Sequence, residues 1–352
     1  MHSQPVPIVW APMNTDHLQK AKQTVREFHG VFDATPNPEL AGVLGTHTTP
    51  DYFWRGMHPF YERNGAKAVV SVFWGPLRQS FSALQRREDI FMAGSNIVDG
   101  GTSTWVAGMG HMVGLFDSDW LGISATRKMT FLRYAEFHRV VGDKIAESAF
   151  FCDIPSVMHQ AGCYPFPPPT GATVIQPGPR THDGILLDAQ PESESEKTMA
   201  LVNKMITDLS ALNESGEDRC PPEILQNTWH DDMIWYGPTG IGTTYTIPRY
   251  QEQHQYPFRT QLKDKVFNGH IAKFAEGHYA GFFGWSNLTN TPTGGFLGMP
   301  GNDVRADMRV VDIYRRDGDK LAENWVFIDL LHWLSMQGLD VLKRVRDTDS
   351  GQ

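Results

Sequence analysis

The sequence contains little cysteine and no long apolar run. Its three cysteines, Cys152, Cys163 and Cys220, are scattered along 352 residues without a CxxC or zinc-finger spacing, so neither a disulfide framework nor a structural zinc site is expected. No stretch of about 18 apolar residues occurs, which argues against a membrane-spanning segment. The net charge of −9 argues against nucleic acid as the main partner, because phosphate backbones bind basic surfaces.

Motifs for common cofactors are also missing. The chain has no GxSxG, P-loop or dinucleotide-binding pattern, so we expect a protein without an organic cofactor. The run His230-Asp231-Asp232 carries residue types that bind metals, but adjacent side chains rarely converge on one ion, and no metal is expected. The opening residues, MHSQPVPIVWAPMN, lack a charged segment followed by a long apolar core. This predicts no signal peptide and a cytoplasmic location.

What the chain does contain is a long internal repeat. Residues 308–338 read as a strand, a tight turn, a second strand and a short helix. Residues 134–162 show the same order, with Glu136 at the position that Asp312 occupies in the later copy. A repeat of this size with two copies predicts two homologous domains rather than a solenoid. The length of the chain agrees, at roughly 150 residues per domain.

The composition suggests where the two domains meet. A segment rich in proline and glycine follows the first copy, with Pro167-Pro168-Pro169 at its centre, and such composition is typical of a connection between domains. We expect a first domain at residues 1–165, a linker at 166–192 that lies along the surface, and a second domain at 193–352. The acidic surface leaves a further homodimer open, beside the internal pseudo-dimer that the repeat implies.

Each half reads as helices followed by antiparallel strands and a short last helix. In the first half, apolar residues recur at helical spacing: Leu18, Ala21, Val25 and Phe28. In the second half, Ser193 and Glu196 form a capping box. Asp153 and Asp329 are expected to cap the two last helices. Residues 287–302, rich in Gly, Pro, Thr and Asn, are expected to form a loop. Helices segregated from antiparallel strands indicate the α+β class, here two tandem cones of curved sheet wrapped on helices.

These segments resemble the SnoaL-like polyketide cyclase family, within the NTF2-like superfamily. The resemblance covers most of both halves and depends on a composite of short motifs, not on one diagnostic piece. The motifs of the first half are WLGISATRK at 120–128, EFHR at 136–139 and GDKI at 142–145, with Asp153. Those of the second half are FLGMP at 296–300, DIYR at 312–315, GDK at 318–320 and DLL at 329–331.

The resemblance implies an α+β cone with a pocket between sheet and helices. For the characterised cyclases it implies an intramolecular aldol closure without metal or organic cofactor, catalysed by a strand carboxylate with a nearby histidine. Carried to this chain, Asp312 is the expected base, assisted by His278 and Tyr314. The expected second or relic site of the first half consists of Glu136, His111 and His138.

The residues themselves are compatible with this chemistry. On a strand, Asp312 shares a face with Val310 and Tyr314, because side chains alternate. A carboxylate in an apolar pocket has a raised pKa and makes a competent base. A position facing solvent remains the alternative for Asp312 and Glu136, and a lone histidine in a strand is more often structural. The residues expected to line a ligand pocket are Trp54, Trp235, Tyr236 and Phe282.

Two functions of different classes remain open at this point. One is a cofactor-free acid/base enzyme that acts on a hydrophobic, carbonyl-bearing small molecule by aldol cyclisation, isomerisation or hydrolysis. The other is a non-catalytic ligand-binding or assembly module, since domains of this kind also serve as such. An acid and a hydrogen-bond donor that converge in an accessible cavity would favour the enzyme, and a cone filled with aromatic side chains would favour the module.

Overall fold

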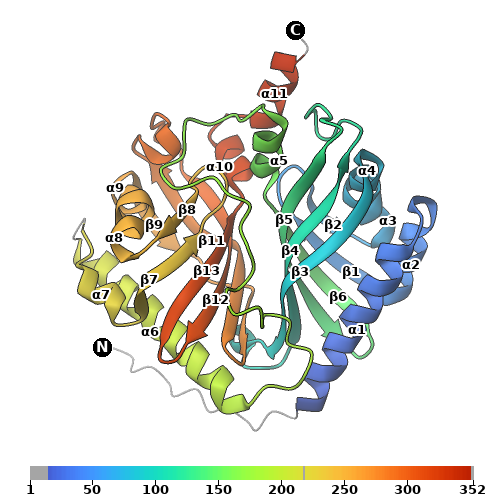
Figure 1. Cartoon of the computed structure of the whole chain (residues 1–352), viewed down its shortest axis with the longest axis horizontal. Coiled ribbons are helices and arrows are strands. Elements are labelled where there is room, and N and C mark those ends of the chain that lie inside the picture. Colours follow the sequence, from blue (N-terminus) through green and yellow to red (C-terminus); the bar gives the residue numbers. More distant parts are fainter. Residues whose placement is uncertain (1–14, 217–218, 350–352) are drawn as a thin grey trace.

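The structure is a computed structural model that describes residues 15–216 and 219–349. Residues 1–14, in which no signal peptide is expected, lie outside the described residues. Two curved sheets stand side by side, and helices cover the outer face of each (Figure 1). No helix of the described residues combines the length and the apolar character that crossing a bilayer requires.

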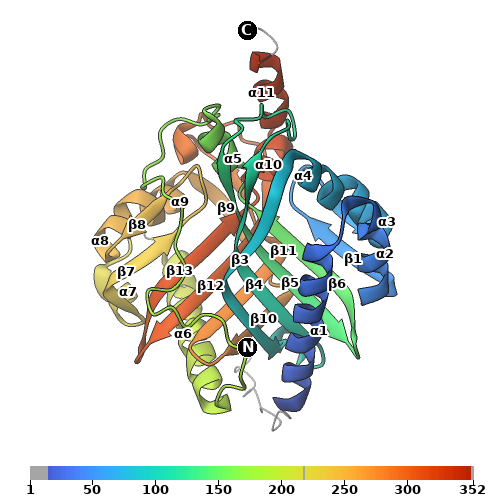
Figure 2. The ribbon, with the colours of Figure 1, turned by 45° about the vertical axis from the view of Figure 1, so that its right-hand side comes forward.

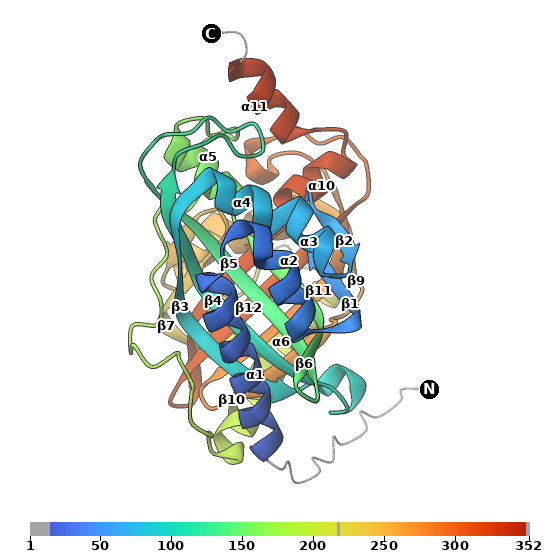
Figure 3. The same cartoon turned by 90° about the vertical axis from the view of Figure 1, so that its right-hand side faces the viewer.

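The first half begins with helices and continues with strands. Figure 3 shows α1 to α4 in front of the first sheet, so these helices cover its outer face. The helices are α1 (Thr15–Ala34), α2 (Leu40–His47), α3 (Ala66–Val69), the π-helical turn η2 (Val70–Trp74), α4 (Gly75–Ser80) and α5 (Ile154–Ala161). The strands are β1 (Thr48–Gly56), β2 (Tyr61–Asn64), β3 (Phe81–Ser95), β4 (Thr104–Phe116), β5 (Met129–Val141) and β6 (Lys144–Cys152).

The second half repeats this order. The helices are α6 (Glu192–Ser215), α7 (Pro222–Gln226), α8 (Ile247–Tyr250), the π-helical turn η4 (Gln251–Gln255), α9 (Tyr256–Thr260), α10 (Leu330–Met336) and α11 (Val341–Asp349). The strands are β7 (Trp229–Tyr236), β8 (Thr243–Tyr245), β9 (Leu262–Phe267), β10 (Ala272–Glu276), β11 (Tyr279–Pro292), β12 (Ala306–Asp317) and β13 (Lys320–Ile328).

The two sheets have the same topology. The first has the order β2-β1-β6-β5-β4-β3, and the second has β10-β11-β12-β13-β7-β8 with β9 paired to β11. Strands β1 and β6 run parallel, as do their equivalents β7 and β13, whereas the other pairs are antiparallel. The α+β class and the tandem arrangement of two cones are therefore confirmed.

Helix α1 closes the first cone as its apolar spacing predicts. Leu18, Ala21, Val25 and Phe28 are all buried against the sheet. They repeat every three or four residues and so lie on one side of a helix with 3.6 residues per turn. Lys20, Gln23, Arg26 and Glu27 between them are exposed, whereas Lys22 and Thr24 are buried beside the stripe.

The opposite faces of the two sheets pack against each other. A separate apolar cluster joins them, with Trp105, Phe137 and Phe151 from the first sheet against Phe274 and Phe283 from the second. Ring centroids of Phe137 and Phe283 lie 4.8 Å apart, and those of Trp105 and Phe283 lie 5.5 Å apart. Full burial contributes about 1.5–3 kcal/mol for a side chain such as Phe, so this contact fixes the two cones as one body.

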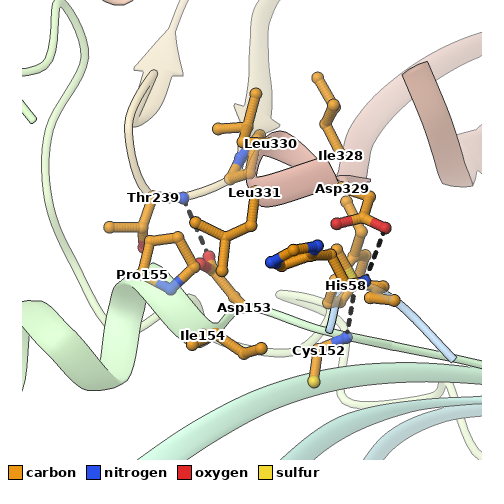
Figure 4. Close-up of a pocket in the computed structure, with 13 residues that line it drawn as sticks. His58, Cys152, Asp153, Ile154, Pro155, Thr239, Ile328, Asp329, Leu330 and Leu331 are labelled. Carbon is orange, nitrogen blue, oxygen red and sulfur yellow. Dashed lines mark hydrogen bonds between the residues drawn. The ribbon is translucent and has the colours of Figure 1, made fainter. Parts of the chain in front are cut away.

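Two aspartates add reciprocal polar contacts between the halves, shown in Figure 4. Asp153 caps α5 by accepting from the Ser156 N–H, and Asp329 caps α10 in the same way from His332. These two caps are confirmed. The second oxygen of Asp153 accepts from Thr239 N–H of the other half at 2.9 Å. The second oxygen of Asp329 accepts from His58 N–H at 2.9 Å.

The connection between α5 and α6 runs from the top of the molecule to its bottom (Figures 1 and 2). It is hydrogen-bonded along the surface. Ala172 exchanges two backbone hydrogen bonds of 2.8 Å with Thr243, and Phe91 of β3 pairs with Gly184 and Leu186 at 2.9 Å. The segment therefore adds to the edges of both sheets and does not swing freely, as expected for a surface linker.

Two local expectations are wrong. Helix α6 begins at Glu192, with Pro191 as its N-cap and no side-chain cap, so Ser193 and Glu196 form no capping box. The second error concerns the first part of residues 287–302, where β11 continues to Pro292 and pairs with β9 and β12; residues 293–302 lie outside the strands, as expected of a loop. The 3-10 turn η5 (Phe296–Gly298) follows, with Phe296 buried. Cross-strand pairing overrode the loop-like composition of residues 287–292.

The reciprocal aspartates generate a stability prediction. Replacing Asp329 by Ala removes a helix cap and leaves the His58 N–H without its acceptor, so we expect a loss of about 1–3 kcal/mol in the free energy of unfolding. Urea denaturation followed by circular dichroism measures it. Asp319→Ala, in an exposed turn of the same half, is the matched control and should be close to neutral. Equal losses in both variants would contradict the role given to the two bonds.

Candidate functional site

The second cone contains a cavity of about 290 Å³ between α6, the η4–α9 segment and the sheet. Its walls are mainly apolar and aromatic, and Asp312 is the single carboxylate among the described residues that line it. The polar and aromatic side chains that line it include Trp235, Tyr250, His254, His270, Phe282, Asp312, Tyr314 and Asn324. A largely apolar pocket with a few convergent polar groups is the usual form of a small-molecule site.

Strand alternation directs Asp312 into this cavity. Val310, Asp312 and Tyr314 all line it, whereas Val311 and Ile313 are buried in the layer between the sheets. The predicted common face of Asp312 and Tyr314 is therefore confirmed.

Neutral donors surround the Asp312 carboxylate. Its Oδ1 accepts from the Tyr314 hydroxyl at 3.1 Å and from the Asn324 side-chain amide at 3.3 Å. Burial raises the pKa of Asp312 to about 6, and the hydrogen bonds from Asn324 and Tyr314 offset this only in part. A carboxylate without a neighbouring cation keeps a high proton affinity, so Asp312 can exchange a proton near neutral pH.

Two histidines form part of the walls. His254 stacks on Trp235, with ring centroids 3.9 Å apart, and His270 lies 4.1 Å from Phe282. Burial lowers the pKa of His254 to about 3, and burial followed by the charge of Lys273 lowers that of His270 to about 4. Both imidazoles are therefore neutral at neutral pH, and the cavity is suited to uncharged groups.

The corresponding place in the first cone is filled. Glu136 is 1% exposed, and aromatic side chains pack around it. The Arg86 guanidinium is hydrogen-bonded to its carboxylate, and His29 and His138 lie 3.2 and 3.3 Å from its oxygens. Although burial opposes it, Arg86 and then His29 hold the pKa of Glu136 well below its usual range. Glu136 is thus a permanently ionised group in a packed core.

The structure places His278 and His111 away from these carboxylates, contrary to expectation. His278 lies in the turn before β11, with its side chain half exposed and its Nε2 3.3 Å from Glu194. His111 lies within β4 and contacts Asp89 at 3.5 Å. The two are not equivalent either: Glu136 pairs with Gly108 and Asp312 with Phe282. The repeated Gly-His pair had suggested a register that the sheets do not have.

Of the four aromatic residues expected to line a pocket, two line the cavity and two do not. Trp235 and Phe282 line the cavity. Trp54, the counterpart of Trp235, is buried in the first cone with Phe73 at 5.7 Å. Tyr236 points to the opposite face of β7 and stacks on Trp325 between the sheets at 5.4 Å. Alternation places consecutive residues on opposite faces, so Trp235 and Tyr236 could not both line one pocket.

Several cavity residues were missed from the sequence, among them Tyr250, His254, His270 and Asn324. Tyr250 and His254 are four residues apart, as is Phe258 from His254, and this helical spacing was a usable signal. Asn324 lies on β13 beside Tyr314, so finding it required the strand register. His270 lies between β9 and β10, and no local pattern marks it.

Comparisons with known proteins concern the fold of each half. No family model and no curated protein matches the chain. Similar solved structures include a protein assigned as a SnoaL-like polyketide cyclase from Jannaschia sp. CCS1, with 17% identity over 46% of this chain and 99% of that chain and a TM-score of 0.33. An NTF2-like protein from Burkholderia xenovorans LB400 is 12% identical over 40% and 96%, with a TM-score of 0.32.

TsrD from Streptomyces laurentii is 19% identical over 40% of this chain and 96% of that chain, with a TM-score of 0.32. The family that the sequence resembles is thus named among these structures. At such identities and TM-scores the matches carry no inference about activity, which has to come from the cavity itself.

The hydrogen bonds of Asp312 predict how its proton affinity responds to mutation. Asn324→Leu removes a donor that lowers the pKa of Asp312, so the pKa should rise further above its wild-type value of about 6. Carboxyl carbon NMR titration measures this, with Asp312→Asn to assign the signal. Asn302→Leu, in an exposed segment, is the control. An unchanged pKa in Asn324→Leu would contradict the observed contact.

The raised pKa also predicts a pH dependence of stability. The folded state holds the Asp312 proton at higher pH than the unfolded chain, whose carboxyl titrates near 3.9. Stability relative to Asp312→Asn should therefore increase as the pH falls from about 7 to about 4. Urea denaturation of both proteins across this range measures it. A constant difference between them would contradict the raised pKa.

Proposed function

We propose that the second cone is a cofactor-free acid/base enzyme acting on a hydrophobic, carbonyl-bearing small molecule, with Asp312 as the base. The observation that carries this proposal is the Asp312 carboxylate in the wall of an apolar cavity, with a pKa of about 6 and no cation among its close contacts described above. General bases work best when their pKa lies near the working pH.

The neighbouring groups suit the removal of a proton from carbon beside a carbonyl. Asp312 would accept the proton, and the enolate oxygen would need a donor. Burial, followed by the charge of Asp312, raises the pKa of Tyr314 and of Tyr250 above the ordinary tyrosine value, so both hydroxyls keep their protons. A hydroxyl fixed in a cavity of low polarity stabilises a developing oxyanion more than water does.

The walls suggest the shape of the substrate. The rings of Trp235, Phe258 and Phe282 line the cavity, and flat apolar faces favour a ring-containing ligand. His254 and His270 are neutral, and Lys273 is bonded to Asn203 at 2.6 Å with a pKa that burial lowers to about 8. An uncharged substrate with one or more ketone groups fits this chemistry. Aldol ring closure is the first candidate reaction, beside isomerisation and hydrolysis.

The first cone serves a different purpose in this proposal. The negative charge of its carboxylate, Glu136, is balanced by Arg86. Its interior is packed with aromatic rings, including Phe28, Phe32, Phe73, Trp74 and Phe150. This favours a structural role for the first half, as a partner that covers the inner face of the second sheet. In this proposal only the second cone, which contains the cavity, carries an active site.

Proton exchange gives a test that does not require the natural substrate. A panel of hydrophobic ring ketones and 1,3-diketones is incubated with the whole protein in deuterated water, and loss of the α-proton signal is followed by NMR. We expect exchange with at least one compound and a rate about 10²–10⁴-fold lower in Asp312→Asn, the usual contribution of a general base. The wild-type rate should fall below pH 6 as Asp312 becomes protonated.

Asp307→Asn is the matched control, because it makes the same change on the same strand outside the cavity lining. It should exchange at the wild-type rate. Compounds that bind, as detected by quenching of tryptophan fluorescence, without any exchange would favour a binding module. Normal exchange in a folded Asp312→Asn protein would refute the assignment of the base.

A further inference from the structure

The filled first cone contains a buried group of two imidazoles and one carboxylate. His29 comes from α1, and Glu136 and His138 lie two residues apart on β5, so they share its cone face. His29 Nε2 is 3.2 Å from one Glu136 oxygen, and His138 Nε2 is 3.3 Å from the other. The donor atoms of all three residues lie within 4.8 Å of one another. The exposed fractions are 6%, 1% and 4%.

The outer nitrogen of each imidazole faces a group that can orient it. His29 Nδ1 lies 3.3 Å from a Glu88 oxygen, and His138 Nδ1 is bonded to the Ser148 hydroxyl at 2.7 Å. Neither Nε2, nor His29 Nδ1, makes a hydrogen bond of good geometry to a group of the described chain. His138 is held through Nδ1 with its Nε2 aimed at a carboxylate, which is the arrangement of metal-binding histidines.

Two carboxylates and one guanidinium surround the two imidazoles. Glu136 lies between the rings, and Glu88 is 3.3 Å from His29 Nδ1. Arg86 is bonded to the Glu136 oxygen that faces His29, whereas the other oxygen faces His138.

We propose that His29, Glu136 and His138 bind a divalent transition-metal ion, of which zinc fits best. Two imidazole nitrogens and one carboxylate oxygen are ligands that Zn²⁺ accepts readily, whereas Mg²⁺ and Ca²⁺ prefer oxygen ligands alone. The ion would tie α1 to β5 across the cone. Short sequence motifs give no sign of this site, because His29 and Glu136 come from distant segments.

Metal content of the whole protein tests this directly. The purified chain is stripped with a chelator, dialysed against zinc or magnesium chloride, and analysed by elemental mass spectrometry and thermal unfolding. We expect about one zinc per chain, a higher melting temperature with zinc that the chelator reverses, and neither effect with magnesium. Co²⁺ should give the visible absorption of a site with nitrogen ligands.

Variants separate this site from chance binding. Ser148→Ala keeps all three ligands and should weaken zinc affinity by about 10–100-fold, the usual effect of losing an outer-shell partner. His138→Asn should weaken it further. His111→Asn, on the neighbouring strand beside Asp89, is the control and should leave zinc binding unchanged.

The proposal is overturned if the wild-type protein retains no zinc after dialysis. It is also overturned if the zinc content and affinity of folded His138→Asn and Ser148→Ala equal those of the wild-type protein, since the bound zinc is then adventitious. Neither result bears on Asp312, because proton exchange in the second cone is measured separately.

Discussion

The contact between the two sheets determines how every strand side chain is used. Because one face of each sheet is buried against the other, alternate residues there are mostly apolar, and the residues between them point into a cone. Arg133 is an exception, and its guanidinium donates to the Val326 and Tyr236 carbonyls of the other half. Phe137 therefore lies between the sheets while Glu136 and His138 face the first cone. Ile313 and Asp312 are divided in the same way. The interface and the two carboxylate positions follow from a single period of two.

The two cones show how neighbours decide the chemistry of equivalent acids. Glu136 is paired with Arg86, and its pKa is held well below the usual range despite burial. Asp312 has neutral donors, and burial raises its pKa to about 6. The first acid remains charged and helps to hold a packed core, whereas the second can exchange a proton in a cavity. Equivalent positions of the two halves thus hold an ionised acid in a packed core and an acid of raised pKa in a cavity.

Much of the fold could be predicted because its signals are local. The stripe of α1, the caps at Asp153 and Asp329 and the shared face of Asp312 and Tyr314 all depend on residues a few positions apart. Some errors were local, such as the capping box of Ser193 and Glu196, and others arose where distant segments decide. His278 was placed by matching Gly-His pairs between the copies, but sheet pairing gives another register. The donor Asn324 on β13 reaches Asp312 on the neighbouring strand β12, and no pattern within one segment reveals such a contact.

The sequence alone determined that there are two α+β halves, and that Asp312 and Tyr314 share one face of a strand. Helical and strand periods are properties of short segments, and so they are legible without coordinates. Only the tertiary structure decided that one cone is hollow and the other filled. That difference depends on how bulky side chains from several elements share one volume, and on whether a cation lies beside the buried carboxylate, as Arg86 does beside Glu136.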